Sequence, residues 1–383
     1  MSLKYSIVIP VYNNKNNVIN SLACISQLKT ENRFEFETIL VDDGSSDGLQ
    51  DSLGMFDGLM NLQFIRIERD SKSCRARARN TGWNAARGKF VVFLDSDILV
   101  RPDYLLQLNR FFTKGENQIV VGNRIHVGAV TLDDIETGTL FEKNQFNAED
   151  FTNIDFRYLV FSSESFNAKL IPDAWLFGYS CNFAISKKWL KVSDGFDERY
   201  IDWGLEDIDL SYRLSLQGVT ISINPFLEVL HQATGHRDDI SISLEKRTGY
   251  LENVHYFLKR YPRSLYHHKN PVHTLLEGKT YLEMDEQYPV VIYDGKKSIN
   301  SIKDECMQWT NNIKQKIILK DFTDNSDLDV WVQNLSGRSE RIFYFPMLKK
   351  VDADKMMVFV TEQRLANVRR YDDVLLQQEL SDL

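Results

Sequence analysis

The stretch Phe90-Val-Val-Phe-Leu-Asp-Ser-Asp97 decides the fold class, because an apolar run ends there in two carboxylates. Consecutive aromatic and β-branched residues are typical of a strand that is buried on both faces. Acids that directly follow such a strand lie at the carboxyl end of a sheet, where α/β proteins bind ligands. One carboxylate can reach a ribose or sugar while the other holds a divalent cation. The same triplet can also be an ordinary polar turn, so it needs support from other motifs.

Upstream of this stretch, short apolar runs alternate with segments of helical spacing. We expect strands at Tyr5–Pro10, Phe36–Val41 and Gln63–Glu68, and helices at Asn16–Leu28 and Cys74–Ala86. Strands separated by helices predict parallel βαβ units with helices on both faces of the sheet. The polar residues after the first two strands should therefore meet the two acids of the opening stretch at one sheet edge. These residues are Tyr12, Asn13, Asp42 and Asp43.

Downstream, the pattern predicts further elements and a second module. The expected elements are a helix from Pro102 to Phe112, strands at Asn182–Ile185, Val219–Ile223 and Glu228–Leu230, and helices at Glu206–Leu216 and Ile242–Arg260. Residues 115–175 show no clear period and are expected to be surface loops. We predict one domain over residues 1–261 and a smaller α/β or α+β module over residues 262–383. Strand-like apolar runs in that module lie at 290–293, 317–319, 330–332, 342–345 and 357–360, with a helix at 301–313.

Composition excludes several classes of protein. The 383 residues contain 46 Lys and Arg against 54 Asp and Glu, a net charge of −8, which argues against a nucleic-acid partner. No apolar run approaches the roughly 20 residues that span a bilayer, and the N-terminus shows no signal-peptide pattern. The four cysteines are scattered, as free thiols in a reducing compartment would be, so we expect a cytoplasmic protein.

The segment Val41-Asp-Asp-Gly-Ser-Ser-Asp47 places two acids and a Gly/Ser turn between a strand and a helix that begins at Gly48. Capping of that helix, most simply by Asp47, accounts for part of the motif. It does not account for Asp43, whose carboxylate can accept a hydrogen bond from a base N–H. Farther on, Arg75 and Arg79 are four residues apart, so a helix places them on one face. Such a pair suits a diphosphate, although a solvated basic face is the plainer interpretation.

Two later segments carry acids and a histidine. Gly195-Phe-Asp-Glu198 precedes Trp203-Gly-Leu-Glu-Asp-Ile-Asp209, where a carboxylate on a Trp-Gly turn can act as a general base toward a hydroxyl. The helix dipole alone explains one or two acids in a first turn, but not all of them. His231 follows a short predicted strand and, paired with Asp97, completes a mixed oxygen and nitrogen site for Mn²⁺ or Mg²⁺. His236 is the other candidate for this metal ligand. The alternative for His231 is a purely structural role.

Together, and in this order, the motifs resemble the family 2 type glycosyltransferases of the GT-A fold. The resemblance rests on Ile7-Val-Ile-Pro-Val-Tyr-Asn13, residues 41–47, Ala78-Arg-Asn80 and Phe93-Leu-Asp-Ser-Asp97. Gly195-Phe-Asp197 with Trp203-Gly-Leu-Glu-Asp207 is similar to a segment of chondroitin-type polymerases, galactosyltransferases and polypeptide N-acetylgalactosaminyltransferases. The resemblance as a whole covers residues 3–235, and it implies a nucleotide-sugar-binding α/β fold with a mostly parallel sheet between helices.

The resemblance implies a role for each matching residue. A UDP-sugar donor would be bound by Pro10, Tyr12 and Asp43 at the uracil, by Arg75 or Arg79 near the diphosphate, and by Asp95 at the ribose or sugar. Asp97 and His231 would hold Mn²⁺ or Mg²⁺. Trp203, Glu206 and Asp207 would contact the acceptor. Asp207 would be the general base, with Glu206 as the first alternative base and Asp209 as the second. Because Asp207 is present, inversion is favoured over retention.

One position departs from the family pattern, and several functional alternatives stay open. Leu205 stands where many relatives have a second glycine, which puts the identity of the sugar in doubt. The expected acceptor is a glycan, with a polypeptide as the second choice. A sugar nucleotidyltransferase would need a Gly-rich first loop, which residues 12–17 lack. A sugar-binding module without catalysis would be expected to have lost an acid, and none is missing. Residues 262–383 carry no motif, and we expect them to serve acceptor docking or self-association.

Overall fold

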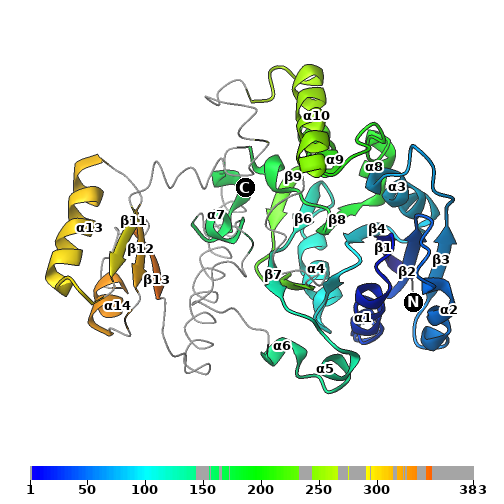
Figure 1. Ribbon diagram of the computed structural model, residues 1–383, viewed down its shortest axis with the longest axis horizontal. Helices are drawn as coiled ribbons and strands as arrows, with labels where there is room; N and C mark the ends of the chain where they lie inside the picture. Colours follow the sequence, from blue (N-terminus) through cyan, green and yellow to red (C-terminus); the bar gives the residue numbers. More distant parts are fainter. Residues whose placement is uncertain are drawn as a thin grey trace. The chain divides into compact units, whose positions relative to one another are not determined.

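The computed structural model describes residues 2–143, 155, 157–163, 166–171, 173–232, 244–265, 275, 290–293, 295–313, 317–321, 323, 326–333 and 342–346. The chain divides into two compact units (Figure 1). One unit comprises residues 1–145 and 167–264, and the other comprises residues 146–166 and 265–383. The second module was expected to begin at residue 262, and the C-terminal part of the second unit begins at residue 265.

A seven-stranded sheet of order β3-β2-β1-β4-β8-β6-β9 forms the centre of the first unit. Its strands are β1 (Leu3–Val11), β2 (Glu35–Asp42), β3 (Leu62–Arg66), β4 (Phe90–Leu94), β6 (Gln118–Val121), β8 (Asn182–Ser186) and β9 (Thr220–Ile223). The four N-terminal strands pair in parallel, whereas β8 runs antiparallel to both β4 and β6. This arrangement confirms the predicted α/β class and the mostly parallel sheet.

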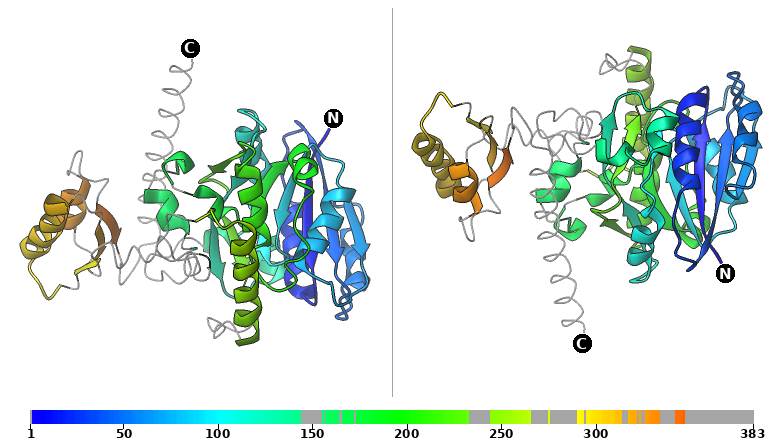
Figure 2. Two further views of the ribbon diagram at one scale, coloured as in Figure 1. Left: turned by 90° about the horizontal axis from the view of Figure 1, so that it is seen from above. Right: turned by 90° about the horizontal axis from the view of Figure 1, so that it is seen from below.

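Helices cover both faces of this sheet. The helices of this unit are α1 (Lys15–Ser26), α2 (Leu49–Ser52), α3 (Arg75–Ala85), α4 (Tyr104–Phe112), α5 (Leu132–Glu136), α6 (Leu140–Lys143), α8 (Lys187–Ser193), α9 (Glu206–Ser215) and α10 (Leu244–Arg260). Short 3₁₀ helices are η1 (Leu53–Phe56), η3 (Ala168–Leu170) and η4 (Ala174–Phe177). Figure 2 shows dark blue α1 in front of the sheet from below and yellow-green α10 in front from above.

Alternation along β1 explains the layering. Ile7 and Ile9 belong to a core that includes Leu22 of α1, whereas Val8 points to the other face. There Gly82 of α3 packs so closely that an added Cβ would lie 2.3 Å from Val8 Cγ1. The glycine is thus required by the close approach of helix and sheet.

A second, three-stranded sheet of order β5-β10-β7 brings distant segments together. It contains β5 (Ile98–Leu99), β7 (Arg124–Val127) and β10 (Val229–Gln232). His231 therefore lies within a strand and not after one, which corrects the predicted boundary. Strands β6 and β7 also correct the expectation of loops over residues 115–175.

The second unit contains α7 (Arg157–Ser163) and a parallel sheet of order β11-β12-β13. The strands are β11 (Val290–Tyr293), β12 (Ile317–Asp321) and β13 (Ile342–Pro346), and the connecting helices are α13 (Ile299–Ile313) and α14 (Ser326–Gln333). The run 330–332, expected to be strand-like, lies in α14. Ile302 of α13 and Leu328 of α14 share one core with Val291 of β11. The predicted runs at 357–360 and the rival His236 lie outside the described residues.

Candidate active site

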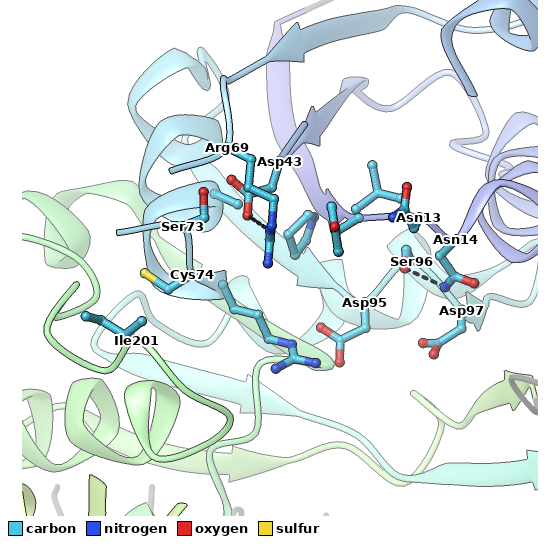
Figure 3. Close-up of a pocket in the computed structure, with 15 residues that line it drawn as sticks. Asn13, Asn14, Asp43, Arg69, Ser73, Cys74, Asp95, Ser96, Asp97 and Ile201 are labelled. Atoms are coloured by element: carbon cyan, nitrogen blue, oxygen red, sulfur yellow. Dashed lines mark hydrogen bonds and ion pairs between the residues drawn. The ribbon is translucent and has the colours of Figure 1, made fainter. Parts of the chain in front are cut away.

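A cavity of about 460 Å³ opens at the carboxyl ends of β1, β2 and β4 (Figure 3). It brings together most of the donor-binding residues predicted from the sequence, namely Pro10, Tyr12, Asp43, Arg75, Asp95 and Asp97. Sequence reasoning did not single out four further lining residues, namely Arg69, Ser73, Cys74 and Ile201. In Figure 3, Asp95 and Asp97 lie at one side of the cavity and Cys74 and Ile201 at the other. The lining is thus mostly polar, with two exposed large hydrophobic residues, Tyr12 and Ile201.

Asp43 is buried and is held by two arginines. Arg69 Nη1 donates to its Oδ2 across 2.6 Å, and Arg77 Nη2 donates to its Oδ1 across 3.3 Å. The Arg69 guanidinium also lies over the Tyr12 ring, 3.7 Å from its centroid. Tyr12 is 44% exposed, so an aromatic face and a carboxylate stand next to each other at the cavity wall. This pairing suits a planar base that offers an N–H.

The neighbouring acid Asp42 has a structural role. It accepts hydrogen bonds from the Ser45 backbone N–H at 2.9 Å and from Arg66, and it is fully buried. Asp47 accepts from the Lys15 backbone N–H at 2.8 Å and from the backbone N–H of Leu49, the first residue of α2, at 3.3 Å. Asp47 thus binds the first turn of α2, as predicted, although the N-cap position itself is Gly48, and it also ties the loop after β2 to the start of α1.

Arg75 and Arg79 share a helix face but differ in environment. Arg75 is exposed and lines the cavity. Arg79 is 2% exposed, and its two Nη atoms donate to Asp95 Oδ1 at 2.9 Å and to Glu206 Oε1 at 2.8 Å. Burial opposes ionisation of Asp95, yet the guanidiniums of Arg79 and Arg75 hold its pKa below the usual value. Arg79 thus links the acid after β4 to the first turn of α9.

Asp97 and His231 lie next to each other, as the sequence pattern predicts. His231 Nε2 is 3.3 Å from Asp97 Oδ2, and the Gln232 backbone N–H donates to the Asp97 carbonyl at 3.0 Å. Asp97 Oδ1 is buried and has no hydrogen-bond partner within the part of the chain that the structure describes. A carboxylate oxygen left bare beside an imidazole nitrogen fits a hard divalent cation.

This pair alone does not complete a cation site. The described residues contain no group of three or more His, Cys, Asp and Glu side chains arranged to hold a metal. A cation at Asp97 and His231 would therefore need further oxygen ligands from water or a bound phosphate. That requirement is typical of Mg²⁺ and Mn²⁺ sites that assemble with a nucleotide.

Asp207 has the electrostatics of a general base. The Ser180 backbone N–H donates to its Oδ2 at 3.0 Å, and the Ile208 backbone N–H donates to its Oδ1 at 2.8 Å. Removal from bulk water and the nearby Glu206 carboxylate raise the pKa of Asp207 to about 6. Glu206 itself is 4% exposed, and its Oε2 has no partner among the described residues. Asp209, the third acid, is fully buried and bound by Arg213 at 2.6 Å.

The Gly195–Glu198 segment is a structural clip. Asn80 of α3 donates to the Phe196 carbonyl at 2.9 Å and to Glu198 at 2.8 Å. Asp197 binds Arg199 at 2.8 Å and also Arg260 of α10. Although burial opposes ionisation, the hydrogen bonds from Arg199 lower the pKa of Asp197 to about 2. These contacts fasten α3, the clip and α10 into one frame around α9.

The Trp203–Leu205 turn presents an aromatic residue beside the acids. Trp203 is 41% exposed and packs against Tyr250 of α10, with 5.2 Å between ring centroids. Leu205 is buried and adopts φ +71°, a left-handed conformation that L-residues with a side chain rarely adopt. That backbone conformation explains why glycine suits the position. The burial of Leu205 shows that its side chain packs in the core.

Comparisons with models of known protein families cover residues 6–236. Residues 6–191 match the family model described as glycosyl transferase family 2, and residues 161–236 match the model described as the N-terminal domain of galactosyltransferase. The two matches together span all the motifs that were grouped in the sequence. They therefore confirm the resemblance drawn from those motifs.

Two curated relatives and one solved structure add detail. The chain is 29% identical over 225 residues to the chondroitin synthase of Escherichia coli, covering 56% of this chain and 32% of that protein. It is 27% identical over 225 residues to the hyaluronan synthase of Pasteurella multocida, covering 56% and 23%. The chain thus spans a third or less of these relatives. The structure of S. aureus TarS 1–349 in complex with UDP-GlcNAc shares the fold, with a TM-score of 0.50, 16% identity, and coverage of 81% of this chain and 80% of that chain.

Proposed function

We propose a sugar-transfer activity for this chain, whose residues 6–191 belong to glycosyl transferase family 2. The protein transfers a sugar from a UDP-sugar to a hydroxyl of an acceptor glycan, with inversion at the anomeric carbon. One observation carries the proposal: Arg79 contacts Asp95 at the nucleotide cavity and Glu206 beside the candidate base, at 2.9 and 2.8 Å. Donor and acceptor chemistry therefore meet around one buried guanidinium.

The donor site is the cavity at the strand ends. Tyr12 offers an exposed ring for stacking, and Asp43 offers a carboxylate for the base N–H, with Pro10 beside them. Arg75 is exposed and lines the cavity, so its guanidinium is suited to a diphosphate. UDP as the nucleotide is supported by the solved neighbour that binds UDP-GlcNAc.

A divalent cation, Mn²⁺ or Mg²⁺, would be held by Asp97 and His231. When bound, such an ion acts as a Lewis acid on diphosphate oxygens and stabilises a UDP leaving group. Asp97, in the turn before β5, brings a bare oxygen, and His231 of β10 brings a ring nitrogen; the Gln232 hydrogen bond fastens the two segments together. Asp95, held by Arg79, is left to orient the ribose or the sugar.

Asp207 takes the proton from the acceptor hydroxyl. A pKa of about 6 keeps this carboxylate ionised at neutral pH while making it more basic than an exposed aspartate. Ser180 orients one oxygen through its backbone N–H and its hydroxyl, at 3.0 and 3.2 Å. Direct attack of the activated hydroxyl on the anomeric carbon inverts its configuration.

The acceptor side is formed by Trp203 and Glu206. An exposed indole beside carboxylates is suited to a sugar ring, which offers both C–H faces and hydroxyls. The curated relatives are named as synthases of chondroitin and hyaluronan, which supports a glycan over a polypeptide acceptor. We assign residues 262–383 to acceptor docking or self-association, and we propose a cytoplasmic enzyme. No helix among the described residues has the length and apolar character to cross a membrane.

A donor screen tests this function. The protein is mixed with Mn²⁺, cell-extract glycans and each of several UDP-sugars, and the release of UDP is measured. We expect one UDP-sugar to give UDP release that depends on acceptor. Release of pyrophosphate from UTP and a sugar phosphate would instead identify a nucleotidyltransferase. Binding of a sugar without turnover of any donor would identify a binding module.

A further inference from the structure

His126 lies beside His231, and the proposed mechanism has not used it. Strand β7 pairs in parallel with β10, and the register places the two histidines opposite each other. Their Nδ1 atoms are 3.1 Å apart, and their ring centroids are 4.9 Å apart. His126 was missed in the sequence because it falls in the stretch that showed no clear period.

The short distance between two ring nitrogens constrains both tautomers. A neutral imidazole carries one N–H donor and one bare nitrogen acceptor. One Nδ1 must therefore donate and the other accept. If His231 accepts at Nδ1, its proton lies on Nε2. If His231 donates at Nδ1, its Nε2 is bare.

The other side of the His231 ring favours one of the two arrangements. Its Nε2 faces Asp97 Oδ2 at 3.3 Å. Without a cation, an N–H at Nε2 satisfies the carboxylate, and His126 then donates at Nδ1. A bare Nε2 facing a carboxylate oxygen is favourable only with a cation between them, and His126 must then accept the His231 Nδ1–H.

We propose that His126 is the positioning residue that sets the tautomer of His231 for cation binding. This inference rests on the proposed role of Asp97 and His231. On cation binding each ring moves its proton from one nitrogen to the other: His231 from Nε2 to Nδ1, and His126 from Nδ1 to Nε2. The pair holds the same number of protons before and after this exchange. Histidine suits position 126 because its Nδ1 can either donate or accept.

Binding of Mn²⁺ by the full chain in the presence of UDP tests this role, with free Mn²⁺ measured by electron paramagnetic resonance. His126→Leu removes both the donor and the acceptor, and we expect about 10- to 100-fold weaker Mn²⁺ binding. His126→Asn places an amide near the position of Nδ1 and should recover part of the affinity. His255→Leu, at an exposed position on α10, is the matched control and should leave the affinity unchanged.

The tautomer itself provides a second readout. Nitrogen NMR of the His231 ring, with diamagnetic Mg²⁺ and UDP, should show the proton moving to Nδ1 in the parent and a mixture of tautomers in His126→Leu. Mn²⁺ binding by His126→Leu within twofold of the parent, while Asp97→Asn loses it, would overturn this inference alone. Equal losses in His126→Asn and His126→Leu would also overturn it, by indicating a packing role. Unchanged binding in Asp97→Asn would remove the metal assignment and this inference together.

Discussion

Arg79 Nη1 donates to Glu206 Oε1 across 2.8 Å, although the two residues are 127 positions apart in the chain. The opposite Nη atom of the same guanidinium binds Asp95. The guanidinium is 2% exposed and the Glu206 side chain 5% exposed, so water cannot readily replace that contact, whereas the Asp95 side chain is 32% exposed. The first turn of α9 is thereby fixed to the end of β4, and a change at one acid must act on the other.

Replacing Arg79 should therefore destabilise the fold as well as the site. Arg79→Met leaves two carboxylates without their shared cation, and we expect a loss of about 3–5 kcal/mol in the free energy of unfolding. Arg79→Lys keeps the charge but cannot bridge two acids with a planar fork. Its free energy of unfolding should therefore lie between those of Arg79→Met and the parent. Urea unfolding measures both.

Arg33→Met is the control for this pair of variants. Arg33 binds Glu31 at the surface, with both side chains more than half exposed, so its loss should cost less than about 1 kcal/mol. A cost for Arg79→Met as small as that of Arg33→Met would show that the buried bridge does not hold the two elements together.

The strained backbone at Leu205 gives an unusual ranking of substitutions. Leu205→Ala and Leu205→Gly both remove a buried side chain, which typically costs about 2–5 kcal/mol. Glycine additionally relieves the left-handed conformation at φ +71°, worth about 1 kcal/mol. We therefore expect Leu205→Gly to be more stable than Leu205→Ala in thermal unfolding. An alanine variant at least as stable as glycine would mean that the backbone relaxes in solution.

Much of the fold and the donor site follows from simple patterns in the sequence. Phe90–Leu94 is apolar and followed by acids, so both its burial and the position of Asp95 could be predicted from strand geometry. The same reasoning placed Tyr12 and Asp43 at the same cavity. These residues follow parallel strands directly, and the parallel register alone brings them together.

Other residues depend on contacts that no local pattern encodes. Strand β6 has only four residues, and its place within the sheet is set by pairing with β8 and β9. Arg79 looks like Arg75 in sequence, yet only Arg79 is enclosed by two distant acids. Arg69 reaches Tyr12 and Asp43 from a loop without any motif. Sequence spacing predicts neighbours along an element, whereas these neighbours come from tertiary packing.

Asp97→Ala should weaken UDP-sugar binding in Mn²⁺. The substitution removes a carboxylate whose Oδ1 has no partner among the described residues, so little structural bonding is lost with it. The same loss should follow when the parent is treated with excess chelator. Isothermal titration with UDP, with and without Mn²⁺, measures both effects. Full transferase activity in excess chelator would refute the metal assignment and leave Asp97 as a turn residue.

A chain truncated after Ser264 should keep the donor site. The described residues that line the donor cavity all lie in the first unit, which ends at that position. We expect UDP-sugar binding to persist and transfer to the natural acceptor to be lost, because residues 262–383 are proposed to serve docking or self-association. A melting curve must first show that the truncated chain is folded. Loss of nucleotide binding in a folded truncated chain would place the second unit in the donor site.

Asp207→Asn should lower activity. The variant cannot accept the acceptor proton, so kcat should fall about 10²- to 10⁴-fold with little change in donor affinity. In the parent, the pKa of about 6 means that kcat should fall tenfold per pH unit below 6, as the base becomes protonated. The same raised pKa affects stability in the parent: the folded state favours protonated Asp207, so the free energy of unfolding should fall by about 1–3 kcal/mol as pH rises from about 4 to about 6. Glu206→Gln is the matched control and should mainly raise the acceptor KM. If Glu206→Gln instead abolishes activity and Asp207→Asn does not, the roles of the two residues are exchanged. A product with the donor's own anomeric configuration would exclude the inverting mechanism.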